Sequence, residues 1–517
     1  MRRGNRMNAI GRRLSMMACA CTVVWLPIVQ NVAALEFDEV SWGFDGRAVP
    51  DEFNLLSVVV RNPSMKPFDG MVTLEQTRGI GRIGGAEVKP CYLEPGGSRF
   101  LQFCPRVTGT SHWRLSDGAD NEDIDPPRED LPAIVRLIDG DNPLRESEFL
   151  RAFPYQRFPT TVGATGGLFA LLADSSPDFA PAQKAAFVDW ILAGGRLHVF
   201  LNTDSQYPDF TEPRLSLDDG ELPMPGGMVK RAIGNGTVTW HGRTVSSLTS
   251  SEVSALEPAR EPLFDQGYDR SIDTTLFKEL QDLTRLDVAW SMVYLAAIVY
   301  IALLGPGHYF WMKRRSRDYR IVLVVLLATV AIFGGLFAYI GRRGYGEKTQ
   351  ASTVSLARHI EGNRYDVTTW GNVFVTKGDD YELRHLSKRS LYSTGDSYES
   401  VNATMMNGGD GVMKTEIPVF SGSTFVHRGT LEGGPRPELL TDTGTGVGRT
   451  IEWQVPSGIA IEGAWVRIQG SVFTAKSVAS EARIVLRNAS LYYPDEDVAV
   501  NPPAAVKLSR IGRLLFH

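Results

Sequence analysis

Two long apolar segments without a charged side chain restrict what this chain can fold into. They run from Val288 to Met312 and from Ile321 to Ile340, and only eight residues separate them. A helix rises about 1.5 Å per residue, so the second segment alone would span the roughly 30 Å hydrocarbon core of a bilayer. Buried core helices are the alternative, but two such segments this close together favour a transmembrane hairpin with helices over 288–312 and 321–340.

The connection between the two segments predicts their orientation. Residues 313–320 read KRRSRDYR, with five basic residues and one acid. Because positively charged loops stay on the cytoplasmic side, we expect this loop in the cytoplasm. Both large parts of the chain would then lie on the other side of the membrane.

The first 34 residues predict an export signal. An apolar run from Leu14 to Val29 is followed by small residues at 32–34, a plausible cleavage site. An uncleaved anchor helix is the alternative, which Pro27 disfavours by interrupting the run. The basic leader that precedes the run includes Arg2, Arg3, Arg12 and Arg13.

Export affects the interpretation of the cysteines. Cys91 and Cys104 would be the two that remain after removal of residues 1–34, and they flank YLEPGGSRFLQF, which predicts two strands around a Pro-Gly-Gly turn. Two thiols facing each other across a hairpin in an oxidising compartment predict a disulfide. Closing this loop would stabilise the fold by roughly 3 kcal/mol.

Short β-branched stretches that end at Pro or Gly predict two all-β regions. Residues 35–116 predict an immunoglobulin-like sandwich, and residues 350–517 predict a second sandwich or a jelly roll. Between the first sandwich and the next domain, residues 117–130 (DGADNEDIDPPRED) predict a solvated acidic linker, because they lack the ligand spacing of the alternative, a calcium loop. Residues 251–287 are expected to link the last domain before the membrane to the first span.

Residues 131–250 show a different periodicity. Continuous apolar runs at PAIVRLID, GGLFALLAD and RLHVFLN predict buried strands, and a helix that begins at Pro181 and ends at Gly194 lies between the last two. LRESEFLRAF, residues 144–153, predicts another helix. Strand–helix–strand units of this length predict a parallel sheet covered on both faces, and MVKRAIGNGTVTWHG adds an antiparallel hairpin.

This stretch resembles the class I glutamine amidotransferase-like fold, through LLADSSPDFAPAQKAAFVDWILAGGRLHVF and the later GNGTVTW. In catalytic members the strand after the helix leads into a sharp turn that carries a cysteine nucleophile. Leu201, Asn202 and Thr203 occupy that point here, and the domain contains no cysteine. Thr203 or Ser205 would need a positioned base to replace it. The resemblance therefore implies an amidotransferase-like (flavodoxin-like) α/β domain that lacks its nucleophile.

The longer arrangement resembles a group of bacterial two-span membrane proteins that combine an exported β-sandwich, such an α/β domain and a membrane hairpin containing Gly-Pro before an aromatic residue, here Gly305-Pro306 and Tyr309. The resemblance implies the cytoplasmic (inner) membrane, with the large regions facing the periplasm or exterior. It also implies envelope or membrane-protein partners, in an assembly linked to chaperone-type ATPases and von Willebrand A-domain proteins.

Polar residues at the predicted strand ends are candidates for a ligand site, since ligands of open α/β sheets collect there. They are Asp139, Asp141, Asp174, Asn202 and Asp204. Solvated loop acids are the alternative. None of the eight histidines has a metal-ligand spacing such as His-Glu-x-x-His, and the net charge of -5 offers no argument for nucleic acid, so no cofactor, metal or nucleic acid is expected.

These observations predict a multidomain, non-enzymatic, membrane-anchored protein that binds or scaffolds envelope partners outside the cytoplasm. The alternative is an extracytoplasmic hydrolase that acts through the strand-end site of the α/β domain.

Overall fold

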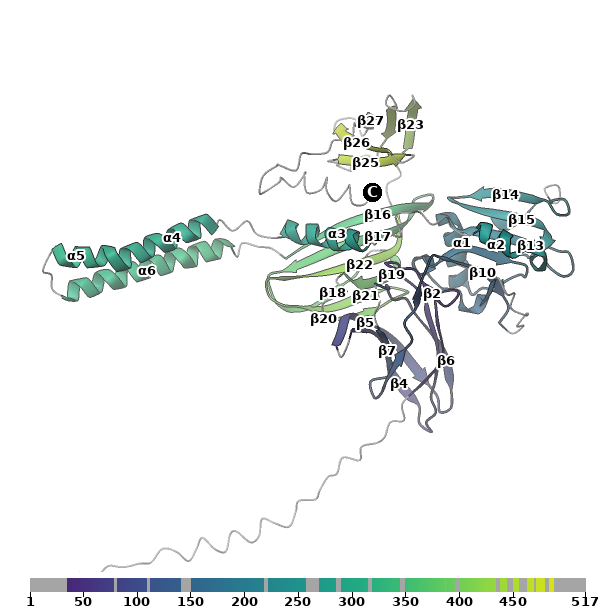
Figure 1. Cartoon of the computed structure of the whole chain (residues 1–517), viewed down its shortest axis with the longest axis horizontal. Helices are drawn as coiled ribbons and strands as arrows, with labels where there is room; N and C mark the ends of the chain where they lie inside the picture. Colours follow the sequence, from purple (N-terminus) through teal and green to yellow (C-terminus); the bar gives the residue numbers. More distant parts are fainter. Residues whose placement is uncertain are drawn as a thin grey trace, which may run out of the picture.

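The computed structural model consists mostly of β-sheets, with a helical arm that projects from the β-rich body (Figure 1). It describes residues 35–78, 81–108, 112–140, 150–217, 222–256, 269–284, 290–314, 319–344, 349–385, 387–395, 400–433, 438–443, 450–454, 463–468, 471–478 and 483–487. The predicted export signal lies outside these residues.

The N-terminal region is a sandwich of two antiparallel layers around an apolar core. Alternating side chains of its strands point inward, so Val58, Val60, Val72 and Leu74 are almost completely buried. One layer has the order β1-β3-β6 and the other contains β5-β4-β7-β8. The strands are β1 (Glu36–Trp42), β3 (Leu56–Arg61), β4 (Phe68–Arg78), β5 (Gly81–Leu93), β6 (Ser98–Phe103), β7 (His112–Ser116) and β8 (Asn121–Ile124).

Residues 117–130 are part of this sandwich, which corrects the expected linker. β8 pairs with β7, and β9 (Arg128–Glu129) pairs with β2 (Arg47–Ala48). The carboxylate of Asp117 accepts a hydrogen bond from the Leu35 backbone N–H at 2.8 Å. The acids of this segment therefore include structural groups.

The two cysteines do not form the disulfide that we predicted; both are free and buried. Cys91 lies on β5, whereas Cys104 follows β6, and these strands belong to opposite layers. Cys91 packs in the sandwich core and Cys104 packs in a second apolar cluster. The Pro-Gly-Gly turn reverses the chain, but it carries the chain from one layer to the other.

Both thiols are expected to resist alkylation in the folded protein. Burial raises the pKa of Cys91, and burial together with the Glu87 carboxylate raises the pKa of Cys104 to about 12, so little thiolate forms at neutral pH. Alkylation with iodoacetamide and peptide mass mapping should find both modified only after denaturation without reductant. A Cys91–Cys104 linked peptide would contradict the structure.

A six-stranded sheet follows, in the order β11-β10-β12-β13-β15-β14. Neighbouring strands from β11 to β15 are parallel, which confirms the arrangement predicted for β10, β12 and β13 and adds β11 and β15 to it. β14 pairs with β15 as the predicted antiparallel hairpin. The family to which this sheet belongs stays a prediction. The strands are β10 (Ala133–Ile138), β11 (Arg151–Pro154), β12 (Leu168–Ala173), β13 (Arg196–Leu201), β14 (Met228–Ile233) and β15 (Gly236–Thr244).

Helix α1 (Pro181–Ala193) has the predicted bounds and buries Phe187, Trp190 and Ile191. Leu172 and Phe200 of the sheet pack in a separate cluster with Val253 of α2 (Ser250–Leu256). The predicted helix over 144–153 is wrong at its end, because residues 151–154 form strand β11, and residues 141–149 lie outside the described part. The remaining short turns are 3₁₀ helices at Tyr155–Arg157, Val162–Thr165, Pro213–Leu215 and Val245–Ser247.

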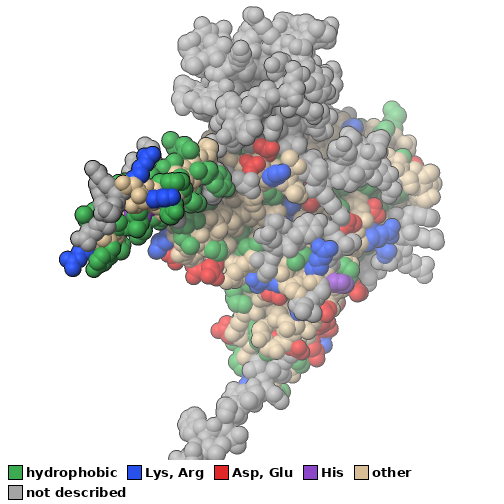
Figure 2. Space-filling view, turned by 60° about the vertical axis from the view of Figure 1, so that its left-hand side comes forward, with side chains coloured by type: hydrophobic (Ala, Val, Ile, Leu, Met, Phe, Trp, Pro, Cys, Tyr) green, Lys and Arg blue, Asp and Glu red, His purple; other side chains and the backbone are tan. Residues whose placement is uncertain are grey.

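Two apolar helices of the arm are long enough to cross a membrane, at Ser291–Arg314 and Tyr319–Ala338. Of their most apolar stretches only 0% and 6% are buried, so they are not core helices. Figure 2 shows hydrophobic side chains gathered over this arm. Gly305-Pro306 lies in a π-helical turn (Leu303–Gly307) between α4 (Trp290–Ala302) and α5 (His308–Arg314), and α6 (Tyr319–Gly344) returns beside them.

The region after the arm packs two sheet layers around a core of its own, but it is not the separate second sandwich that we predicted. Its strands β18, β21 and β20 extend a layer of the N-terminal sandwich to give the seven-stranded order β18-β21-β20-β5-β4-β7-β8. The contact is a parallel pairing of β20 with β5, in which Thr404 is opposite Ala86 and Met405 is opposite Glu87. These strands are β18 (Asp379–Leu383), β20 (Ser400–Met406) and β21 (Val412–Ile417).

Four further strands form an antiparallel sheet that faces α1 and α3 (Asp269–Thr284), in the order β16-β17-β22-β19 (Figure 1). They are β16 (Gln350–Glu361), β17 (Arg364–Val375), β19 (Lys388–Thr394) and β22 (Ser421–Glu432). The last strands that the structure describes form a five-stranded sheet of order β23-β24-β27-β26-β25. They are β23 (Glu438–Thr443), β24 (Thr450–Gln454), β25 (Gly463–Ile468), β26 (Ser471–Val478) and β27 (Arg483–Arg487).

Candidate functional site

The strand-end candidates lie at one edge of the six-stranded sheet, where the side chains of Asp139, Asp174 and Asn202 bind other groups of the protein. Asp174, after β12, forms an ion pair with Arg136 of β10, with Nη2 and Oδ2 2.5 Å apart. Asp139, after β10, accepts a hydrogen bond from Gln156 at 2.8 Å. Asp141 lies outside the described residues. The structure therefore brings Asp174 to an arginine rather than to the other acids.

The turn after β13 is held together by Asn202. The Oδ1 atom of Asn202 accepts hydrogen bonds from the backbone N–H groups of Asp204, at 2.9 Å, and Gln206, at 2.8 Å. The N–H of Ser205 donates to the Asn202 carbonyl, and Ser205 has a left-handed φ of 61°. Asparagine at this point therefore builds the turn, which accounts for a polar residue here.

Leu201, at the end of β13, is half-buried, whereas Thr203, Asp204 and Ser205 are exposed. Among the described residues, no hydrogen bond joins the hydroxyl of Thr203 or Ser205 to a base. Nor do the described residues contain a group of three or more His, Cys, Asp or Glu arranged to hold a metal. This edge of the sheet therefore carries a polar turn that is held by hydrogen bonds within the turn.

A histidine pair that sequence reasoning missed lies on the neighbouring strands. His198 of β13 and His241 of β15 approach within 3.1 Å, Nδ1 to Nε2, and His241 stacks on Phe200. Burial is the main cause that lowers the pKa of each imidazole to about 4; the partner histidine adds to the effect at His198 and Arg243 adds to it at His241. Both histidines are therefore neutral at physiological pH. Each histidine lies within a predicted strand. Only a parallel alignment of these two strands would have brought His198 and His241 together.

This pair predicts a loss of stability in acid. With a folded pKa near 4 and an ordinary value of 6.5, His198 binds fewer protons in the folded state than in the unfolded state between these values. The stabilisation is complete above pH 6.5 and is lost as pH falls towards 4, by about 2 kcal/mol at pH 5. Melting temperatures from pH 7.5 to 4.5 should fall less steeply for His198→Gln than for the wild type. Identical slopes would contradict this assignment.

A second polar cluster is buried between β19 and β22. Ser387 Oγ lies 2.9 Å from His385 Nδ1 and 3.1 Å from His427 Nε2, and Ser390 lies 3.1 Å from the same Nε2. Burial lowers the pKa of His427 to about 3. Serine beside histidine is the pattern of an activated nucleophile. However, His427 is completely buried and Ser387 is 6% exposed, so a substrate would have no access to the hydroxyl.

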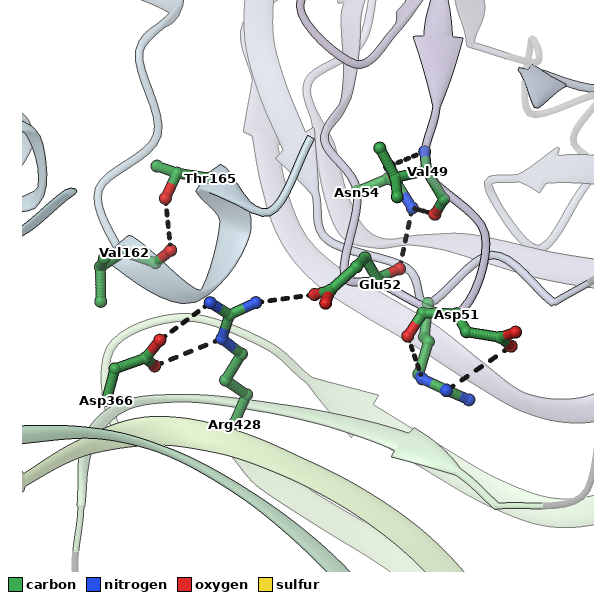
Figure 3. Close-up of polar contacts among 9 residues, drawn as sticks. Val49, Asp51, Glu52, Asn54, Val162, Thr165, Asp366 and Arg428 are labelled. Carbon is green, nitrogen blue, oxygen red and sulfur yellow. Dashed lines mark hydrogen bonds and ion pairs between the residues drawn. The ribbon is translucent and has the colours of Figure 1, made fainter. Parts of the chain in front are cut away.

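A third polar arrangement lies at the junction between the parts of the chain before and after the arm (Figure 3). Arg428 of β22 donates to both carboxylate oxygens of Asp366, at 3.2 and 2.8 Å, and to Glu52 of the N-terminal sandwich at 2.8 Å. Its side chain also lies against Gly163, in a turn of the six-stranded-sheet region. One buried arginine side chain therefore reaches all three parts of the body.

Other contacts across the junction repeat this pattern. Arg364 of β17 pairs with Asp189 of α1 at 2.6 Å. Asp273 of α3 accepts a hydrogen bond from the Trp370 indole at 2.9 Å across the junction, and on its own side of the junction it pairs with Arg106, which is 6% exposed. The apolar core is shared in the same way, since a single cluster contains residues of α1, β13 and β22.

Comparisons with known proteins do not identify a family. No protein-family model and no curated protein matches the chain. Among solved structures, a cycloisomaltooligosaccharide glucanotransferase of Paenibacillus sp., complexed with cycloisomaltoheptaose, is similar over 76% of this chain and 69% of that chain. The identity is 7% and the TM-score is 0.17, a value that carries no argument about fold or function.

Proposed function

We propose that the protein is a non-enzymatic, membrane-anchored scaffold of the bacterial cytoplasmic membrane, which binds envelope partners on the periplasmic or outer side. The observation that carries the proposal is the junction. The segments before and after the helical arm share a sheet, a core and the buried Arg428. A body built from both segments must lie on one side of any membrane that the two helices cross.

The charge at the turn of the arm supports the choice of side. Lys313, Arg314 and Arg320 flank the end where the two helices meet, and basic residues are retained in the cytoplasm. The body at the other end of the arm would then be outside. Residues 131–250 would be the amidotransferase-like domain, kept as a rigid recognition module. The partners would be membrane proteins of an assembly linked to a chaperone-type ATPase and von Willebrand A-domain proteins.

A hydrolase that acts through the strand ends is the competing proposal. It would require Asp139, Asp174 and Asp204, or the hydroxyl of Thr203 or Ser205, to meet a base. The ion pair of Asp174 with Arg136 and the turn formed by Asn202 support binding over catalysis, because these polar groups already have partners within the fold.

Photocrosslinking in native membranes tests the scaffold proposal. A photoreactive residue at Met228, which is 72% exposed on β14, or at Met65, which is 92% exposed, should trap a partner. The adduct should disappear when Arg428→Ala disrupts the junction, and should persist in the surface control Arg384→Ala. An Asp204→Ala variant should trap the same partner. No adduct at either position, with a measured turnover that Asp204→Ala removes, would overturn the proposal in favour of the hydrolase.

A further inference from the structure

The chain enters and leaves the helical arm at one end of the β16-β17-β22-β19 sheet. Thr284, the last residue of α3, accepts a hydrogen bond from Asn372 of β17 at 3.2 Å. Gln350, the first residue of β16, pairs with Phe374 of the same strand β17. Residues 285–289 and 345–349 connect these points to the helices, and at about 3.5 Å per residue each connection reaches about 20 Å at most. This end of the sheet is therefore held near the membrane that the arm crosses.

The turn between β21 and β22 lies at the same end (Figure 1). Ser421, which follows the turn, pairs with Val375, the last residue of β17. The next turn, at Thr376 to Gly378, touches it: a Cβ added to Gly378 would lie 2.9 Å from the Val419 nitrogen. Thr376 in turn donates its N–H to Thr349 at 3.3 Å, which ties this end to the connection from α6.

Two apolar side chains project from this turn. Val419 is 56% exposed and Phe420 is 43% exposed. Phe420 also has a φ of 55°, in the left-handed region that favours glycine and disfavours bulky residues. Neither solvent exposure nor the backbone favours phenylalanine here, and such conformations concentrate at functional positions.

We propose that Val419 and Phe420 insert into the interfacial layer of the bilayer and fix the body against the membrane surface. The proposal rests on the membrane anchorage proposed above. Transfer of aromatic and aliphatic side chains into this layer lowers their free energy, because their apolar parts leave water. The nearby charges are mixed, because Lys377 pairs with Asp379 at 2.9 Å and Asp380 follows. The contact is therefore apolar and requires no anionic lipid.

The test uses the full chain, with Cys19 and Cys21 replaced by serine, in phosphatidylcholine vesicles. An environment-sensitive fluorophore on Phe420→Cys should be quenched by nitroxides on the lipid chains, with an iodide quenching constant severalfold below that of the control Met228→Cys. Met228 is 72% exposed on β14, at the far end of the body. The buried Cys91 and Cys104 should remain unlabelled.

A third label separates this inference from the membrane anchorage on which it rests. Val330 lies within α6 and is 40% exposed. Lipid quenching at Val330→Cys without quenching at Phe420→Cys would overturn the docking of the turn alone. Loss of lipid quenching at both positions would overturn the membrane anchorage as well. An unchanged melting temperature of Phe420→Cys would establish that the labelled protein is folded.

Discussion

Replacing Arg428 with alanine is expected to destabilise the whole body by about 3–5 kcal/mol, because the Asp366 carboxylate would remain buried without this cation. Asp366 is 4% exposed and Arg428 is 8% exposed, so water cannot substitute for the guanidinium. Glu52 would also lose its contact, which joins the N-terminal sandwich to β22. Two parts of the body should therefore loosen together.

The measurement is the melting temperature of the purified full chain, together with limited proteolysis of the junction. We expect Arg428→Ala to melt about 5 °C or more below the wild type. Arg384→Ala is the matched control: Arg384 pairs with Glu382 on the surface, its side chain is 67% exposed, and its loss should cost less than about 1 kcal/mol. Equal melting temperatures for the two variants would show that Arg428 does not hold the junction.

A single methyl group on Gly236 is expected to have an effect of similar size. Gly236 begins β15, where the β14–β15 hairpin packs on the end of α1. A Cβ there would lie 2.0 Å from the Ile191 carbonyl oxygen and 2.4 Å from that of Gly195, so the backbone must move. Such overpacking should cost about 3 kcal/mol or more.

Gly81→Ala provides the control for Gly236→Ala. Gly81 begins β5, and a Cβ there would meet nothing within 4 Å. Its substitution should leave the melting temperature within about 1 °C of the wild type, since open positions rarely change stability by more than about 0.5 kcal/mol. If Gly236→Ala were tolerated equally well, the hairpin would not pack against α1 as described.

Local patterns predicted elements well and their partners poorly. Pro181 and Gly194 gave the bounds of α1, and the uncharged runs gave the two apolar helices. The Pro-Gly-Gly turn between Cys91 and Cys104 indicated a reversal of the chain, but not which layer the next strand would join. Turn chemistry is local, whereas the choice of layer depends on the packing of the whole sandwich.

The contacts of the junction could not be predicted from local sequence patterns, for the same reason. Arg82 donates to the Val401 carbonyl at 3.0 Å across 319 residues, and nothing near either residue indicates the other. Arg428 looks like an ordinary strand residue until Asp366 and Glu52 surround it. At the strand ends, the sequence placed Asp174 and Asn202 at the correct edge. The sequence could not show that the Asp174 carboxylate already pairs with Arg136. Nor could it show that the Asn202 side chain already bonds to backbone groups of its own turn.

The central claim is that the segments before and after the arm form one body through β5 and β20. Ala86 and Thr404 are paired there, and neighbouring strands lie about 4.8 Å apart, within the reach of a disulfide. The test introduces cysteines at both positions and a protease site within residues 315–318. Every natural cysteine precedes the site, so only a disulfide that involves Thr404→Cys can link the two halves after cleavage, and Thr404→Cys without Ala86→Cys should give separate halves.

After mild oxidation in membranes and cleavage, the Ala86→Cys/Thr404→Cys protein should run at full length without reductant and as two halves with it. The control pairs Ala86→Cys with Lys414→Cys, one strand further away on β21, about 10 Å from β5, and should give separate halves. Separate halves for Ala86→Cys/Thr404→Cys, or equal linking in both proteins, would contradict the shared sheet and with it the one-sided body on which the proposed function rests.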